Sequence, residues 1–150
     1  MPEESAIDRA HQDAREGKSP STQAGEFVRE EIEHVREGKH GARNPKQAIA
    51  IGLSKARRAG INLPPPGKSS SLRVRKKAAQ DSRRGRSGHR PSRSRSRATS
   101  RALKRERRSS ASTRALSRQA RTAARRRGSA SRRRAARKAV RTRRRSRGSS

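Results

Sequence analysis

The chain has 150 residues, of which 44 are Lys or Arg, 12 are Asp or Glu and only 25% are hydrophobic. A chain so poor in apolar residues cannot bury a core of its full length, because too little burial is available to offset the conformational entropy of folding. Cysteine is absent, which excludes disulfides and thiolate chemistry, and no apolar run approaches the roughly 18 residues of a membrane span. The first ten residues are acidic where a signal peptide would be basic, so we expect a cytoplasmic protein.

The charge is divided unevenly along the chain. Residues 1–60 carry 11 basic and 10 acidic residues, whereas residues 61–150 carry 33 basic and 2 acidic residues. This asymmetry predicts a polyanionic partner for the second part. We therefore expect a small helical head at 1–60, a Pro/Gly/Ser linker at 61–71 and a disordered, basic, nucleic-acid-binding tail at 72–150.

Apolar residues in the head recur at intervals of three and four, as they do along one face of a helix. They predict amphipathic helices at about 20–37 and 45–59, and a weaker helix at about 3–16. The fold class expected for the head is therefore all-α, with two to three short helices and a helical hairpin. The packing seam of the hairpin would hold Phe27, Val28, Ile32, Ile49 and Leu53. Because so small a head is only marginally stable, we also expect a homodimer contact through this seam.

A repeated tetrapeptide, REGK at 15–18 and at 36–39, marks the ends of two of these helices. In both copies the glycine can take the left-handed backbone that caps a helix, and the lysine follows near the negative end of the helix dipole. Ser19-Pro20 and Asn44-Pro45 come next, and each sets a capping side chain before a proline whose fixed φ suits a first helical turn. The pattern predicts that the chain ends and restarts a helix twice.

The segment SPSTQAGEFVREEIEHVREGKHGARNPKQAIAIGLSKARRAG at 19–60, followed by LPPP, resembles an uncharacterised bacterial family of small basic proteins. The resemblance covers about residues 15–66. It implies a bacterial origin and brings no activity, cofactor or ligand residue with it.

The tail is an Arg/Ser/Ala-rich sequence in which arginine outnumbers lysine, and PSRSRSR at 91–97 resembles protamine-like and linker-histone-like tails. The planar guanidinium suits phosphate oxygens, which it can bind through two parallel hydrogen bonds. Because its arginines repel one another, we expect the tail to be largely disordered, with conditional helices that form on binding. The arginines expected to contact nucleic acid are Arg83, Arg84, Arg86, Arg93, Arg95, Arg97, Arg114, Arg118, Arg121, Arg125, Arg126, Arg127, Arg132, Arg133, Arg134, Arg143, Arg144 and Arg145.

No enzymatic activity, cofactor or metal site is expected. The histidines, at positions 11, 34, 40 and 89, do not show HExxH spacing and have no thiol partners. A helix-turn-helix at 20–59 is disfavoured, because the joint GKHGARN at 38–44 is longer than the three or four residues of that motif.

These features predict a non-enzymatic, largely sequence-nonspecific DNA-binding protein of the nucleoid type, which neutralises phosphates and condenses duplex DNA. The first alternative is an RNA- or ribosome-associated protein. It is disfavoured because single-stranded RNA is usually held by stacking on aromatic rings, and the chain has one Phe and no Tyr or Trp. The second alternative is an adapter whose head binds a partner protein. No membrane partner is expected.

Overall fold

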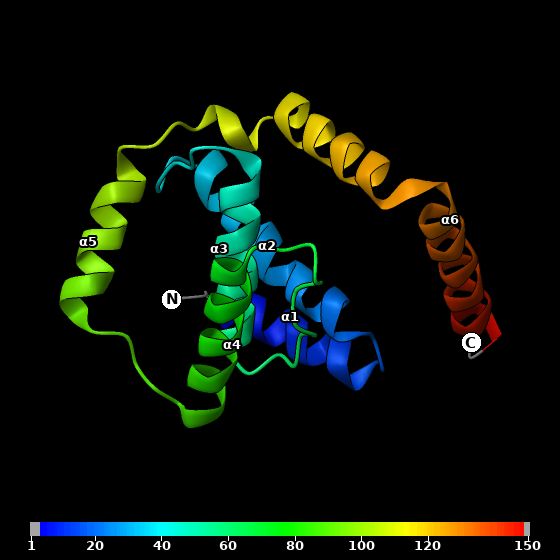
Figure 1. The fold of residues 1–150 in the computed structure, drawn as a ribbon. Coiled ribbons are helices and arrows are strands. Elements are labelled where there is room, and N and C mark those ends of the chain that lie inside the picture. The colour runs from blue at the N-terminus through cyan, green and yellow to red at the C-terminus, as the bar shows by residue number, and fades with distance from the viewer. Residues whose placement is uncertain (1–3, 149–150) are drawn as a thin grey trace. The chain divides into compact units, whose positions relative to one another are not determined.

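The computed structural model describes residues 4–148, which are predominantly α-helical and contain no β-strand. The elements are α1 (Glu4–Arg15), α2 (Pro20–Arg36), α3 (Pro45–Arg58), α4 (Leu72–Ser87), α5 (Arg93–Lys104), the 3₁₀ turn η1 (Ser109–Ala111) and α6 (Thr113–Gly148) (Figure 1). The chain divides into two compact units between Ser112 and Thr113. The first unit therefore includes α4, α5 and η1 as well as the three helices of the head.

The expected fold class is wrong in one respect, because the tail is not disordered. Between residues 72 and 148 the chain forms α4, α5 and α6. Alanine and arginine are among the strongest helix formers, and no proline follows Pro91, so this sequence can satisfy its backbone hydrogen bonds in helices without a large core. Part of the tail also packs on the head, because α4 contacts α3. The excess of positive charge in the tail did not predict this contact.

The three helices expected in the head lie within one residue of their predicted limits. Gly17 and Gly38 end α1 and α2 with φ of 71° and 79°, the left-handed backbone that the REGK repeat predicted. Ser19 and Asn44 cap α2 and α3, and each side chain accepts the backbone N–H three residues further on. The predicted stops and restarts of the helices are confirmed.

The turn after α1 is also held by charge. The Lys18 ammonium donates to Asp13 Oδ1 at 2.8 Å and lies 2.9 Å from Glu16 Oε2. The bond to Asp13 is the main cause that raises the pKa of Lys18, and the bond from Lys18 is the main cause that lowers the pKa of Glu16. Because the ammonium is exposed to solvent, these contacts stabilise the turn only weakly.

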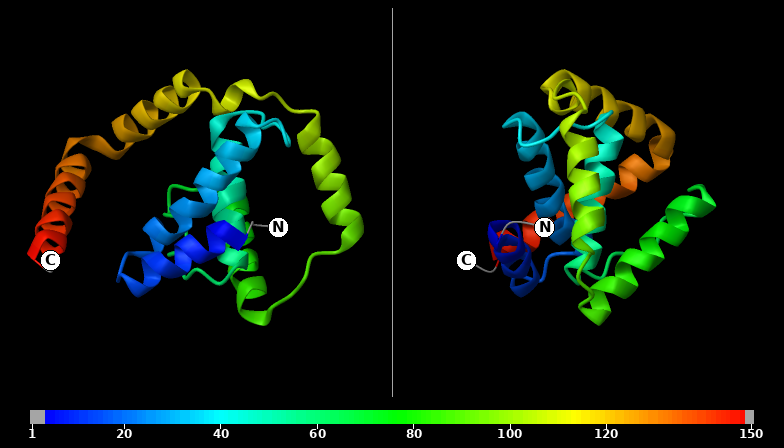
Figure 2. Two further views of the ribbon diagram at one scale, coloured as in Figure 1. Left: turned by 180° about the vertical axis from the view of Figure 1, so that it is seen from behind. Right: turned by 90° about the vertical axis from the view of Figure 1, so that its left-hand side faces the viewer.

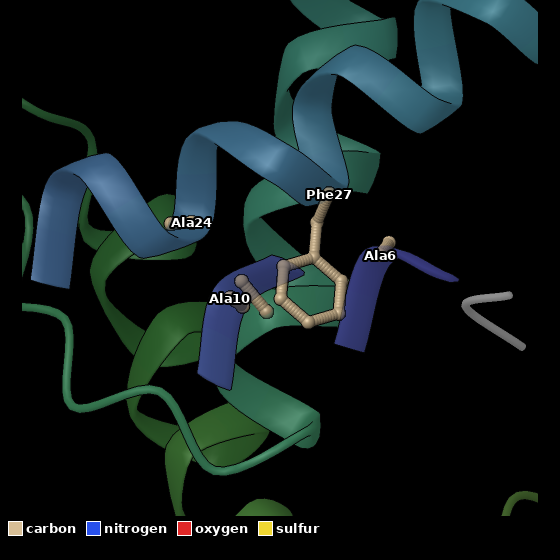
Figure 3. Close-up of a cluster of buried hydrophobic side chains, with 5 residues drawn as sticks. Ala6, Ala10, Ala24 and Phe27 are labelled. Carbon is tan, nitrogen blue, oxygen red and sulfur yellow. The ribbon is translucent and has the colours of Figure 1, made fainter. Parts of the chain in front are cut away.

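Two small apolar clusters form the core of the first unit. In the first, the Phe27 ring points from α2 toward α1 and lies beside Ala6 and Ala10 (Figure 3). Ala24 and Ala56 complete this cluster, and Ile7, Leu53, Ile61 and Leu63 pack against it. The second cluster comprises Val35, Ala42, Ala48 and Ala111, with Ile32 packed against it. Alanine predominates in both clusters, so the helices approach closely around one large ring.

The expected seam residues do not form one cluster: Phe27 and Leu53 belong to the first cluster or pack against it, Ile32 packs against the second, and Val28 lies against Gly52 of α3. Phe27 is 1% exposed, while Val28, Ile32, Ile49 and Leu53 are half-buried. Gly52 sets the distance between the two helices, because a Cβ at this position would lie only 2.6 Å from the Cα of Val28. The homodimer through this seam stays a prediction, although within one chain the Phe27 ring is already covered.

Helix α3 lies at the centre of the first unit, in contact with α2, α4 and η1. A recognition helix must present one face to the major groove. Because α3 is packed against three elements, it has little free surface for a DNA groove. The packing of α3 therefore disfavours the helix-turn-helix hypothesis, as the long joint does.

Helix α4 is fixed to α3 by a buried carboxylate and a close backbone approach. Asp81 is 1% exposed and accepts hydrogen bonds of 2.6 Å from Ser54 Oγ and from Lys77 Nζ. One turn further on, a Cβ at Gly85 would lie 2.1 Å from the carbonyl oxygen of Arg57. A side chain at position 85 would therefore force the two helices apart.

We expect Asp81→Ala to release α4 from α3. The change removes hydrogen bonds to a charged group, each worth about 1.5–3 kcal/mol, while the exposed Lys77 ammonium can return to water. Amide hydrogen exchange should then become faster throughout α4 and remain unchanged in α2. Ser82→Ala, at a half-buried neighbouring position, is the control. If the amides of α4 exchange as slowly in Asp81→Ala as in the wild type, this carboxylate does not fix α4 to α3.

Helix α5 and the second unit have little packing of their own. No residue of α5 is buried, and it stands away from α1–α3 in Figure 1 and in the left view of Figure 2.

The second unit is α6, which is interrupted at Gly128 by a backbone of φ 75° and ψ 167° and contains no buried residue. Within residues 4–148, no helix is long and apolar enough to cross a lipid bilayer.

Candidate nucleic-acid interface

The 18 arginines predicted to bind nucleic acid are distributed over three helices. Three lie on α4, three on α5 and twelve on α6. All are exposed to solvent except Arg84, which is half-buried. Helix α6 therefore carries most of the candidate interface.

The first segment of α6 presents a stripe of guanidinium groups. Arg114, Arg118, Arg121 and Arg125 follow one another at intervals of four, three and four residues, which places them on one face of the helix. They line a shallow, open hollow together with Thr113, Ser117 and Thr122. Guanidinium and hydroxyl groups both donate hydrogen bonds to phosphate oxygens. The hollow thus has the donors that a sugar-phosphate backbone needs.

The second segment of α6 repeats this arrangement at higher density. The triplets Arg132–Arg134 and Arg143–Arg145 lie eleven residues apart, close to three full turns, so they project from similar faces of the helix. Arg137, Lys138, Arg141 and Arg147 fill the interval between and after them, and all four are exposed. The prediction from sequence did not include these four residues, although their place on the same charged helix would have indicated them.

The density of charge on α6 matches that of a nucleic-acid strand. The 36 residues of α6 contain 16 Lys and Arg and no Asp or Glu. At 1.5 Å per residue this is one positive charge per about 3.4 Å of helix, the axial spacing of phosphates along one strand of B-DNA. No acidic side chain on the helix offsets this field.

Helix α5 offers a smaller basic surface of the same kind. Arg93, Arg97 and Arg101 recur every four residues along one side of the helix, and Arg95 is exposed beside them. Ser92 caps the helix and accepts the N–H of Arg95 at 3.3 Å. The short PSRSRSR segment is therefore largely helical and displays its arginines to solvent.

Helix α4 contributes less than the sequence suggested. Arg84 and Arg86 flank Gly85, which packs on the end of α3, so one side of this basic run is covered by protein. Arg83 and Arg86 remain exposed. Of the three arginines in this run, Arg83 and Arg86 are therefore the ones that a ligand can reach from solvent.

Two further arginines serve the fold. The Arg36 guanidinium donates through Nε to the carbonyl oxygen of Ala111 at 2.9 Å, and Arg108 donates to the carbonyl oxygen of Arg36. These bonds hold η1 against the end of α2. Sequence alone did not distinguish Arg108 from the arginines around it, because the bond depends on tertiary contact.

Three side chains with metal-binding potential also come together in the first unit. Glu31, His34 and His40 each bring one candidate ligand atom, and these atoms lie within 4.8 Å of one another. No metal site was expected, since the spacing of these residues matches no common zinc motif. The cluster arises because the joint after α2 folds His40 back toward the helix.

Comparison with known proteins gives one match. The model of DUF6496, a family of unknown function, matches residues 16–68. No curated protein and no solved structure matches the chain. The resemblance to an uncharacterised family, expected over about residues 15–66, is confirmed to that extent. The matched segment contains α2, α3 and the Glu31–His34–His40 cluster, and it ends before the arginine-rich helices begin.

Proposed function

We propose that this protein is a non-enzymatic, bacterial DNA-binding protein of the nucleoid type, which binds duplex DNA with little sequence preference and condenses it. The observation that carries the proposal is α6, where 16 positive charges stand on 36 residues with no acid and no buried side chain. Contacts between such a surface and phosphates give strong, salt-sensitive affinity and no direct reading of base sequence.

The division of charge between the two units supports binding through more than one surface. Residues 1–112 carry 28 basic and 12 acidic residues, a net charge of +16, and residues 113–150 also carry +16. Helix α5 and the exposed arginines of α4 supply the basic surface of the first unit. Two basic surfaces on one chain can contact two DNA segments, and a second contact strengthens the first through effective concentration.

Duplex DNA is favoured over single-stranded RNA by the position of the one aromatic residue. Phe27 is 1% exposed in the core, so its ring is not available to stack on a base. Proteins that bind single strands without sequence preference use stacking of this kind along with charge. Structured RNA bound through its phosphates is one alternative, and an adapter whose head binds a partner protein is the other.

Binding of the full chain to random-sequence duplex DNA tests the proposal. We expect unrelated duplexes of equal length to bind equally, and affinity to fall about 10³–10⁵-fold between 50 and 200 mM salt if six to ten phosphates are contacted. Band-shift titrations would measure both quantities, with structured RNA as competitor. Preference for a single sequence, or displacement by RNA at a tenth of the DNA concentration, would contradict the proposal.

A further inference from the structure

The side chains of Glu31 and His34 lie on the same face of α2, because residues three apart are neighbours on a helix. His40 belongs to the joint between α2 and α3, and its ring meets that of His34 edge to face with centroids 6.1 Å apart. Glu31 is fully buried, and His34 is 9% exposed. We propose that Glu31, His34 and His40 form a binding site for one divalent transition-metal ion of the Zn²⁺ type.

The hydrogen bond of His40 presents the correct ring nitrogen to an ion. His40 Nδ1 lies 2.9 Å from the carbonyl oxygen of Gly41. A carbonyl only accepts, so Nδ1 carries the hydrogen and Nε2 of the neutral ring has a free lone pair. Histidines that bind metals commonly donate their other ring N–H to a backbone carbonyl in this way, which fixes the tautomer and the ring orientation.

The carboxylate of Glu31 faces that lone pair. His40 Nε2 lies 2.8 Å from Glu31 Oε1, so in the neutral form of the ring two electron-pair donors meet. A metal ion placed at this point would be held by both groups. Both oxygens of Glu31 are buried; the nearest cationic or imidazole groups are His40 Nε2 at Oε1 and Lys55 Nζ, 2.6 Å from Oε2. Oε1 is thus the oxygen that could share a metal ion with the imidazole of His40.

Neighbouring charges leave one oxygen of Glu31 for the ion. The Lys55 ammonium lies 2.6 Å from Oε2 and 4.0 Å from Glu30 Oε2. Lys55 therefore holds the far oxygen of Glu31 and orients the carboxylate, while Oε1 points to His40.

The backbone around His40 is fixed in advance of binding. The N–H of Gly41 donates to the carbonyl oxygen of Leu103 at 2.8 Å, and a Cβ at Gly41 would lie 1.9 Å from the carbonyl oxygen of Glu106. The joint is thus held against the last turn of α5 and the segment that follows it. A ligand on a fixed backbone binds a metal with less loss of entropy than one on a free loop.

The chemistry of the three ligands selects the ion. Two imidazoles and one carboxylate are a set that Zn²⁺ takes in three-ligand sites, with the fourth position left to water. Mg²⁺ and Ca²⁺ prefer oxygen ligands throughout and should bind poorly. His40 retains 14% exposure of its side chain, which provides contact with solvent for a bound water.

Zinc titration of the full chain tests the site. With ZnCl₂ in a phosphate-free buffer after removal of metals by a chelator, calorimetry should find one ion per chain, and saturation with Zn²⁺ but not Mg²⁺ should raise the melting temperature of the first unit. Glu31→Gln and His40→Gln should each weaken binding at least about tenfold. His11→Gln and His89→Gln, which change exposed histidines, are the matched controls and should bind as the wild type does.

A second measurement does not depend on the folding of any variant. X-ray absorption at the zinc edge of the wild-type complex should show two imidazole ligands, and Co²⁺ in place of Zn²⁺ should give the intense visible bands of a four-coordinate site. Absence of stoichiometric zinc binding, equal losses in the control variants, or a shell of water oxygens alone would overturn the proposal. In that case a proton would join His40 to Glu31.

Discussion

Duplex DNA affinity is expected to fall steeply when the arginines in the first segment of α6 are replaced by glutamine. The variant changes six residues, Arg114, Arg118, Arg121, Arg125, Arg126 and Arg127. Glutamine is nearly as good a helix former as arginine, so α6 should persist while its charge is lost. If all six contact phosphates, the slope of log K against log salt should become shallower by about five, at about 0.9 per contact.

The control for this variant keeps the charge and changes the geometry. Lysine at the same six positions preserves the number of counterions released but removes the planar fork of donors. The six-lysine chain should therefore keep the salt slope of the wild type in titrations of one random-sequence duplex. An unchanged slope in the glutamine variant would mean that DNA binds elsewhere on the chain.

The parts of the fold that sequence reasoning found are those set by local chemistry. Gly17 and Gly38 need a left-handed backbone, and Ser19 and Asn44 cap the helices that follow them. Each of these signals acts within four residues, so it can be read without knowledge of the fold. The limits of α1, α2 and α3 followed directly.

The net charge of the tail predicts disorder, whereas its helix propensity favours the helices that the structure contains. Repulsion among arginines opposes compaction, but a helix satisfies its backbone without burying side chains, and alanine and arginine both favour it. Two local exceptions in the basic sequence could have indicated packing on the head. Asp81 is one of two acids after residue 60, and Gly85 interrupts a run of arginines; both contact α3.

The metal-site proposal could not have come from spacing. His40 reaches Glu31 only because the joint is held by backbone bonds to residues more than sixty positions further along the chain, among them the bond from Gly41 N–H to Leu103. Such a contact leaves no periodic trace in the sequence. The arginine stripe of α6, in contrast, follows from its intervals of three and four once the helix is known.

Phe27→Ala is expected to unfold the first unit at ordinary temperature or bring it close to unfolding. The ring is the one large side chain in a cluster made otherwise of alanines, and its removal should cost about 3–5 kcal/mol through lost burial and the cavity left behind. For a domain of this size, each kcal/mol lowers the melting temperature by about 4–8 °C. Calorimetry would measure the shift. Val74→Ala, at a residue that is 51% exposed on α4, is the control and should change stability by less than about 0.5 kcal/mol.

The same variant separates the roles of the two units. Helix α6 lies outside the first unit and contains no buried residue, so its charges do not depend on the Phe27 core. We therefore expect Phe27→Ala to retain most of the salt slope for duplex DNA, whereas the six-glutamine variant loses most of it and keeps the melting temperature of the first unit. Condensation of DNA should weaken in both, because it needs two basic surfaces on one chain. A salt slope that collapsed on loss of the Phe27 ring would place the DNA contacts on the folded first unit and remove α6 from the centre of the interface.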